Sequence, residues 1–280
     1  MTSPAESPPL AHTQAPLPHP TPAVEVLSAE KTYLNGTQAL LPVDLTIEEG
    51  EFVTLLGPSG CGKSTLLKMV AGLLEPTDGR LHLWRKPVAQ LEESGKKMAF
   101  VFQSPTLMPW ARVQTNVRLP LDLAGVPRAE ADARVTEALA LVGLAKFAHA
   151  LPRALSGGMQ MRVSIARGLV TQPDLLLMDE PFGALDEITR HKLDADLLDL
   201  WRKKKLTVIF VTHSIHEAVF LSSRVVMMAA RPGRVVEEFR IDAPYPRTAD
   251  FMVSPEFSRY AKLLQDSLLR ASVDTEETVA

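Results

Sequence analysis

Four short runs of apolar residues, each of strand length, constrain the fold of this chain more than any other feature. They are EFVTLL (51–56), KMAFVF (97–102), DLLLM (174–178) and LTVIFV (206–211). The stretches between them carry helical patterns, namely KSTLLKMVAGLL after Gly62, AEADARVTEALALV (129–142) and TRHKLDADLLDLWRK (189–203). Continuous apolar strands that alternate with helices are typical of a parallel sheet covered on both faces. The sequence therefore predicts an α/β fold.

Each of the four runs ends, on its carboxyl side, in glycine or in polar residues that can bind a ligand. In chain order these are Gly57, Gln103, the pair Asp179 and Glu180, and the pair Thr212 and His213. Open α/β sheets bind ligands in the crevice beyond the carboxyl ends of their strands. We therefore expect one edge of the sheet to carry the chemistry of this protein.

The segment GPSGCGKS (57–64) matches the phosphate-loop pattern G-x-x-x-x-G-K-S. It lies between a predicted strand and a predicted helix, which is the context that this motif requires. Backbone N–H groups of such a loop surround phosphates, Lys63 reaches the terminal phosphates and the Ser64 hydroxyl binds Mg²⁺. We interpret Cys61 as a small filler residue and not as a nucleophile. The residues expected around the nucleotide here are Gly57, Pro58, Ser59, Gly60, Cys61, Gly62, Lys63, Ser64 and Thr65.

The polar residues at the other strand ends complete a candidate catalytic set with Lys63. Asp179 is expected to hold Mg²⁺ through water, and Glu180 to act as the general base toward a water molecule. His213 would contact the γ-phosphate, and Gln103 would bind Mg²⁺ and sense the γ-phosphate. The competing interpretations are solvated acids, a structural histidine and a surface glutamine.

A second candidate anion site lies in ALSGGMQMRVSIARGL (154–169). Ser156 stands where a helix N-cap would be, and Gly157 and Gly158 follow it. The free N–H groups and the dipole at such a point attract anions. Two further residues are candidates for nucleotide contact. Tyr33 would stack on a purine ring, unless it only packs in a strand, and Asp186 in GALDE (183–187) is expected near the same sheet edge.

The composition limits the possible classes of protein. The 280 residues carry a net charge of −3, so no basic surface points to nucleic acid as a partner. One cysteine excludes an intramolecular disulfide, and no apolar run approaches the ~18 residues of a membrane-spanning helix.

We divide the chain into a disordered, proline-rich tail (1–22), a folded domain (23–240) that begins near Val24, and a helical C-terminal extension (241–280). Within the extension, FMVSPEFSRYAKLLQDSLLRA (251–271) predicts an amphipathic helix, and VDTEETVA (273–280) an acidic frayed end.

Taken together, the motifs make the chain resemble the nucleotide-binding subunit of an ATP-binding-cassette (ABC) transporter. GPSGCGKST resembles its Walker A loop, FQ its Q-loop, LSGG its signature, LLLMDEP its Walker B strand, GALD its D-loop and VTH its switch histidine. The resemblance runs from about Val24 to about Arg240 in the order that the family has. It implies a P-loop NTPase fold with a mixed sheet core, a helical subdomain (about 104–160) and an antiparallel β subdomain.

A finer resemblance points to one branch of the family. FQSPTLMPWARVQTNVRLPL, LSGGM, DEPFGALDEITR and ARPGRVVEEF are similar to subunits that energise importers of nitrate, sulfonates, taurine and related small solutes. Trp110 belongs to this pattern, either as an aromatic residue of the helical subdomain or as a contact with a membrane partner. Three residues depart from the family pattern, namely Met161, Gly168 and Ser214. We interpret Met161 as a residue that packs against a neighbouring helix.

The resemblance also implies partners. Two copies would face each other head to tail, with each ATP between the Walker motifs of one copy and the LSGG of the other. Separate permease subunits would carry the solute through the membrane, supplied by an extracytoplasmic solute-binding protein. The chain would then lie on the cytoplasmic face of the membrane and require ATP and Mg²⁺. The alternatives are a soluble ABC-type ATPase that acts on DNA or ribosomes, and a small-molecule phosphotransferase.

Overall fold

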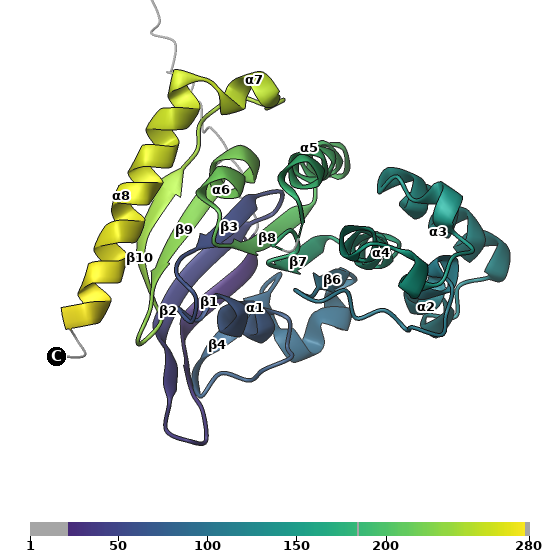
Figure 1. The fold of residues 1–280 in the computed structure, drawn as a ribbon. Helices are drawn as coiled ribbons and strands as arrows, with labels where there is room; N and C mark the ends of the chain where they lie inside the picture. The colour runs from purple at the N-terminus through teal and green to yellow at the C-terminus, as the bar shows by residue number, and fades with distance from the viewer. Residues whose placement is uncertain (1–21, 184, 278–280) are drawn as a thin grey trace, which may run out of the picture.

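A six-stranded sheet in the order β10-β9-β3-β8-β7-β6 forms the centre of the molecule (Figure 1). The computed structural model describes residues 22–183 and 185–277, with side chains as far as residue 271. Neighbouring strands from β9 to β6 are parallel, whereas β10 runs antiparallel to β9. The strands are β3 (Phe52–Leu56), β6 (Met98–Val101), β7 (Leu175–Asp179), β8 (Thr207–Thr212), β9 (Arg224–Ala229) and β10 (Arg234–Arg240). The four predicted strands are thus neighbours in a mixed sheet.

The two faces of this sheet belong to two separate hydrophobic clusters. Side chains of successive strand residues point to opposite faces, so Phe52 and Leu56 of β3 join one cluster while Val53 and Leu55 join the other. The first cluster includes α5 (Glu187–Lys204), α6 (Ile215–Leu221) and α8 (Pro255–Glu277). The second includes α1 (Lys63–Val70). Burial on both faces explains why these strands are continuously apolar.

The second cluster is closed by a smaller antiparallel sheet in the order β2-β1-β4-β5. Its strands are β1 (Pro22–Thr32), β2 (Gln38–Glu48), β4 (Asp78–Leu83) and β5 (Lys86–Pro87). It is the antiparallel β subdomain that the family resemblance implies. The 3₁₀ helix η1 (Val88–Ser94) follows it in the chain.

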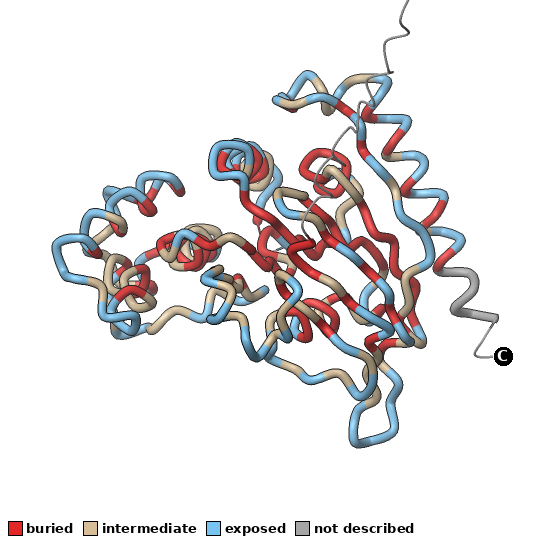
Figure 2. The backbone as a smooth tube through the Cα atoms, turned by 180° about the vertical axis from the view of Figure 1, so that it is seen from behind, coloured by how far each residue is buried: buried red, intermediate tan, exposed pale blue. Residues whose placement is uncertain are grey.

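A helical arm lies beyond β6, on the side of the sheet opposite α8 (Figure 1). It consists of α2 (Val113–Leu123), α3 (Arg128–Leu141) and α4 (Gly157–Leu169), with the short 3₁₀ helices η2 (Ala145–Phe147) and η3 (Pro152–Ala154) between α3 and α4. Figure 2 shows buried residues gathered in the central strands and many exposed residues in this arm. The predicted boundary near residue 160 falls inside α4, which continues to Leu169 because Met161 and Ile165 pack into the core.

Several predicted boundaries are wrong at the ends of elements. The predicted tail ends one residue too late, because Pro22 begins β1 opposite Glu48; residues 1–21 lie outside the described residues. The helix expected to extend from Lys63 to Leu74 ends at Val70. The amphipathic helix expected over 251–271 is divided into α7 (Ala249–Met252) and α8, because Val253 and Ser254 interrupt it before Pro255.

The C-terminal extension packs on the domain core. Phe257 and Leu264 are buried on the face of α8 that contacts the first cluster, and Ala261 and Leu268 flank them. The predicted frayed end is wrong as far as Glu277, since the backbone of α8 is helical to that residue. Residues 278–280 lie outside the described residues.

Candidate functional site

The phosphate loop joins β3 to α1 in a conformation that depends on glycine. Gly62, the N-cap of α1, has φ of 86°, in the left-handed region that favours glycine, and a Cβ there would meet the Ala39 carbonyl oxygen at 3.0 Å. Lys63 follows directly and is buried. Its Nζ donates hydrogen bonds to the carbonyl oxygens of Gly57 (2.8 Å) and Pro58 (2.9 Å). The lysine charge is therefore held inside the loop at the amino end of a helix.

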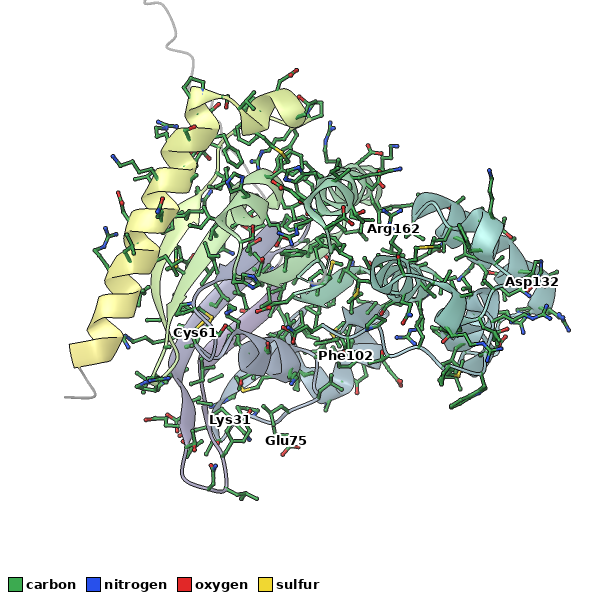
Figure 3. All side chains as sticks on the ribbon, in the orientation of Figure 1. Lys31, Cys61, Glu75, Phe102, Asp132 and Arg162 are labelled. Atoms are coloured by element: carbon green, nitrogen blue, oxygen red, sulfur yellow. The ribbon has the colours of Figure 1, made fainter. Side chains whose placement is uncertain are left out.

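Cys61 lies inside this loop and is buried (Figure 3). Its Sγ is 3.6 Å from Nζ of Lys63, a contact that favours the thiolate. Burial is the larger effect and raises the pKa of the thiol. The thiol is therefore neutral and shielded, which agrees with its interpretation as a filler residue.

Asp179, the last residue of β7, lies directly beside the phosphate loop. The Ser64 hydroxyl donates a hydrogen bond to its Oδ1 at 2.7 Å. Burial raises the pKa of Asp179, while the bond from Ser64 acts in the opposite direction. A carboxylate and a hydroxyl at this distance provide the hard oxygen ligands that Mg²⁺ prefers. Within the described ranges, no group of three or more His, Cys, Asp or Glu side chains is arranged to hold a metal, so the remaining ligands of an ion here would be phosphate oxygens and water.

Glu180 brings the ends of three neighbouring strands together. Its Oε2 lies 3.3 Å from Nδ1 of His213, which follows β8, and accepts a hydrogen bond at 3.4 Å from Nε2 of Gln103, which follows β6. Glu180 has φ of 46°, and its N–H donates to the carbonyl oxygen of Val211. A non-glycine residue in this strained conformation is typical of functional sites. The side chain of Glu180 is largely buried, whereas that of His213 is 60% exposed and can reach a ligand.

The two nucleotide candidates outside the sheet edge differ in where they lie. The Tyr33 hydroxyl is 3.5 Å from Oγ1 of Thr65 at the start of α1, and the tyrosine is 41% exposed. Asp186 instead caps α5, where its carboxylate accepts from the N–H of Thr189 at 3.0 Å. Tyr33 thus lies beside the phosphate loop. In the described part of the chain, no hydrogen bond joins Asp186 to that loop.

The LSGG segment begins a helix, as the sequence predicts, but it is separate from the phosphate loop. Ser156 is the N-cap of α4, and its Oγ accepts from the N–H of Met159 at 3.3 Å. Ser156 and Gly157 are exposed, and among the described residues neither forms a hydrogen bond with residues 57–64. A Cβ at Gly158 would lie 2.8 Å from Leu185, which connects this helix end to the segment before α5.

Two residues behind the switch histidine, the buried Glu217 and the half-buried Arg190, were not predicted. Glu217 of α6 accepts a short hydrogen bond from the Thr212 hydroxyl, and its Oε1 lies 3.6 Å from Nε of Arg190. Arg190 also donates to the carbonyl oxygen of Leu185 at 3.0 Å. This network links the end of β8 to the start of α5. No pattern in the sequence signals this network, because its residues come from two separate helices and the end of a strand.

Two of the three departures from the family pattern have local structural explanations. Ser214 is the N-cap of α6 and accepts from the N–H of Glu217 at 3.3 Å, so it performs the capping role for which aspartate is also suited. Met161 is buried in the first cluster, which confirms its predicted packing role. A Cβ at Gly168 would lie 3.4 Å from Val101 of β6, an ordinary van der Waals contact, so nothing in the structure explains glycine at this position.

Comparisons with known proteins agree with this geometry. Residues 40–183 match a family model described as ABC transporter. A taurine import ATP-binding protein of Rhizobium johnstonii is 48% identical over 231 residues, which are 81% of this chain and 87% of that protein. An aliphatic sulfonates import ATP-binding protein of Bacillus licheniformis is 43% identical over 222 residues, 78% of this chain and 85% of that protein.

A solved structure supports the same assignment. It is a dimeric ATP-binding cassette in a post-hydrolysis state bound to ADP and Pi, with a TM-score of 0.71 and 35% identity over 79% of this chain and 100% of that one. The chain therefore belongs to the ABC transporter family, as an ATP-binding protein with ATPase activity.

Proposed function

We propose that this chain energises an importer of a small solute, of the sulfonate or taurine class or a related anion such as nitrate. One observation carries the ATPase part of this proposal. Glu180 lies within reach of His213 and Gln103, one residue after the Asp179 carboxylate that binds Ser64 of the phosphate loop. This edge therefore combines a phosphate cradle, an oxygen pair for a cation and a base.

The residues divide the reaction among them. Glu180 accepts a proton from the water whose oxygen forms the new bond to the γ-phosphorus, while the bond from that phosphorus to the β,γ-bridging oxygen breaks. ADP and phosphate are the products. Lys63 neutralises charge on the transferred group, and His213 orients Glu180 and the γ-phosphate. Gln103 reports the state of this centre to the helical arm, whose first helix begins ten residues later.

Mg²⁺ would be held at Ser64 and Asp179, with Gln103 as a third protein contact. The fit rests on the 2.7 Å hydroxyl–carboxylate pair beside the phosphate loop. When bound, the ion would neutralise the β- and γ-phosphate oxygens. Tyr33 would stack on the adenine ring, which is consistent with its exposed position next to Thr65.

A second copy of the chain would complete each ATP site. Ser156 and Gly157 support this step, because they are exposed at the amino end of α4, where N–H groups can bind an anion. An anion held by this chain's own phosphate loop does not reach them, so a second copy would supply it. In a head-to-tail dimer the LSGG of one copy would face Lys63 of the other, and Asp186 would lie near the interface between the two copies. One interface would then contain two equivalent sites.

Permease subunits and a solute-binding protein would be the remaining partners. Within residues 22–183 and 185–277, no helix has the length and hydropathy to cross a membrane. Trp110 lies between Gln103 and α2, the first helix of the arm, and is 77% exposed. This position is suited to a contact with a permease at the cytoplasmic face. The arm also speaks against the DNA or ribosome alternative, since α2 and α3, of 11 and 14 residues, are too short for the long coiled coil of such proteins.

The general-base assignment is tested by Glu180→Gln. The variant should bind ATP with unchanged affinity and form a stable ATP-dependent dimer, while hydrolysis falls at least ~100-fold. Glu75→Gln, which changes an exposed acid, is the matched control. Hydrolysis at the parental rate in Glu180→Gln would contradict the assignment.

The solute is tested separately. The chain is co-purified with the permease that binds it and reconstituted in vesicles, and uptake of labelled taurine, an alkanesulfonate and nitrate is compared. We expect ATP-dependent uptake of one of them, which disappears in the Glu180→Gln complex. Export in place of uptake, or no transport of any of these anions, would refute the solute proposal without affecting the ATPase assignment.

A further inference from the structure

A groove lined by aromatic side chains lies at the edge of the central sheet opposite the phosphate loop. It has a volume of about 540 Å³, within the ~300–1,000 Å³ range of ligand pockets. Gly50 and Thr207 in its lining stand at the amino ends of β3 and β8, so it is separate from the ATP site at the carboxyl ends. Its main side chains are Glu49, Trp84, Lys96, Trp201, Lys205 and Tyr245.

The aromatic walls are held in place by polar contacts. The indole N–H of Trp84 donates to Glu49, and that of Trp201 donates to the carbonyl oxygen of Gly50 at 3.0 Å. The rings of Trp201 and Tyr245 have centroids 4.9 Å apart, and Lys96 lies over the ring of Trp84. These three aromatic residues come from segments far apart in the chain. They form a fixed apolar wall that is still partly open to solvent.

Two of the three cationic side chains at the rim have no acidic partner in the part of the chain that the structure describes. Lys96 is paired with Glu49 and Asp174. Arg202 and Lys205, at the end of α5, are exposed and form no ion pair or side-chain hydrogen bond with any residue that the structure describes. An occupant of this groove should therefore combine apolar rings with hydrogen-bond acceptors and should lack positive charge.

The amino-terminal segment leaves the folded domain beside this groove. Pro22, the first residue of β1, pairs with Glu48, and the carbonyl oxygen of Ala23 accepts from the N–H of Trp84 at 3.0 Å. Residues 1–21 contain six prolines, three of them at alternate positions 16, 18 and 20, and no lysine or arginine. Proline-rich segments adopt the polyproline II helix, which has no internal hydrogen bonds and leaves its carbonyl groups free.

We propose that residues 16–21 of the same chain occupy this groove as a polyproline II segment. Proline rings would pack on Trp84, Trp201 and Tyr245, as they do in aromatic grooves that recognise proline-rich peptides. Arg202 and Lys205 would donate to the free carbonyl oxygens. The segment is joined directly to Pro22, so its effective concentration at the groove is high, and residues 16–21 would extend only about 19 Å in this conformation. Docking would tie the end of α5 to the start of β1.

The first experiment places a photo-reactive phenylalanine analogue at Leu17 in the full-length chain. Irradiation followed by peptide mapping should give cross-links within one chain to Trp84, Tyr245 or residues 201–205. The matched control carries the same analogue with Pro16, Pro18 and Pro20 replaced by glycine, which keeps the reach but removes the rigid conformation. We expect at least a threefold lower yield in the control. An equal yield, or cross-links distributed over other surfaces or between chains, would overturn the proposal.

The second experiment observes the groove itself. In a Trp110→Phe background the fluorescence comes from Trp84 and Trp201 alone, because the chain has three tryptophans. Replacing the three prolines with glycine should shift the emission to longer wavelength as both rings gain solvent, and acrylamide quenching should increase. Unchanged emission and quenching would count against docking. ATP hydrolysis by Glu180 is not involved, so these results stand apart from the proposed transport function.

Discussion

Helices α1 and α4 both begin at a point that attracts anions, but their surroundings differ. The start of α1 has a glycine N-cap in the left-handed conformation, a buried lysine and, next to it, the Ser64–Asp179 pair. The start of α4 has an exposed serine cap, two glycines and no acidic residue in its first turn. The first is a complete cradle, and the second provides only N–H groups and a dipole. A site of the second kind needs an anion brought by another molecule.

Removing Lys63 should make the two helix ends alike, and it is the largest effect we expect. Lys63→Ala leaves the N–H groups of α1 in place but takes away the charge that meets the terminal phosphates. ATP binding, measured by calorimetry, should weaken at least ~10-fold, and hydrolysis should fall ~1,000-fold or more. The control is Lys68→Ala, which removes an exposed lysine of the same helix. Parental hydrolysis in Lys63→Ala would mean that the N–H groups alone are sufficient.

Blocking the start of α4 should separate binding from hydrolysis. In Ser156→Arg a long side chain occupies the surface that we assign to the second copy's ATP, so the isolated chain should bind nucleotide normally while hydrolysis falls roughly 100-fold. Ser156→Ala is the matched control, because it removes the cap bond at a cost of about 1 kcal/mol without adding bulk. Loss of nucleotide binding by the monomeric Ser156→Arg variant would contradict a role in another chain's site.

A buried acid of α5 provides a third test, through stability. Asp194 of α5 is 2% exposed and its Oδ1 has no hydrogen-bond partner among the described residues. Burial, assisted by the charge of Glu217 and opposed by Arg190, raises the pKa of Asp194 to about 8. The unfolded chain releases this proton near pH 4. Between pH 4 and pH 8 the folded state therefore holds more protons, and the free energy of unfolding should fall as pH rises.

The variant Asp194→Asn should remove this dependence, because an amide stays neutral. Relative to the parent, its free energy of unfolding should increase by about 1 kcal/mol for each pH unit between 5 and 8. Urea unfolding at three pH values in this range measures the slope. Asp199→Asn, at an exposed site on the same helix, should leave the slope unchanged. A slope as steep in Asp194→Asn as in the parent would assign the dependence to another group, such as Glu217, whose pKa burial also raises.

The contacts that were predicted share one property, namely that they lie where parallel strands end at one edge of the sheet. Asp179 meets Ser64 across the end of β8, and Glu180 meets His213 directly, because β3, β8 and β7 end at the same edge of a parallel sheet. Periodicity and motif order are sufficient to indicate this shared edge. The contacts that were missed join segments without a shared pattern. Arg190 reaches Glu217 across two helices, and Trp84 lines a groove with Trp201. Such contacts depend on how the layers pack, and no local spacing encodes them.

Substitutions at the two glycines of LSGG should give the smallest effects on the free energy of unfolding. They also test most directly whether the start of α4, unlike that of α1, binds a phosphate of another chain. A Cβ at Gly157 would meet nothing within 4 Å, whereas one at Gly158 would lie 2.8 Å from Leu185. Gly157→Ala should therefore change the free energy of unfolding by less than about 0.5 kcal/mol, and Gly158→Ala should lower it by about 1 kcal/mol.

The ATPase rates of the two glycine variants should rank differently from their free energies of unfolding. If α4 faces another chain's phosphate, the Cβ at Gly157 interferes there, so Gly157→Ala should lower the ATPase rate of the dimer severalfold although the monomer is as stable as the parent. Thermal unfolding of the monomer and steady-state hydrolysis at dimer-forming concentrations measure the two quantities. Parental activity in Gly157→Ala would show that this surface does not approach a phosphate. The amino end of α4 would then have the geometry of an anion site without binding an anion in the dimer.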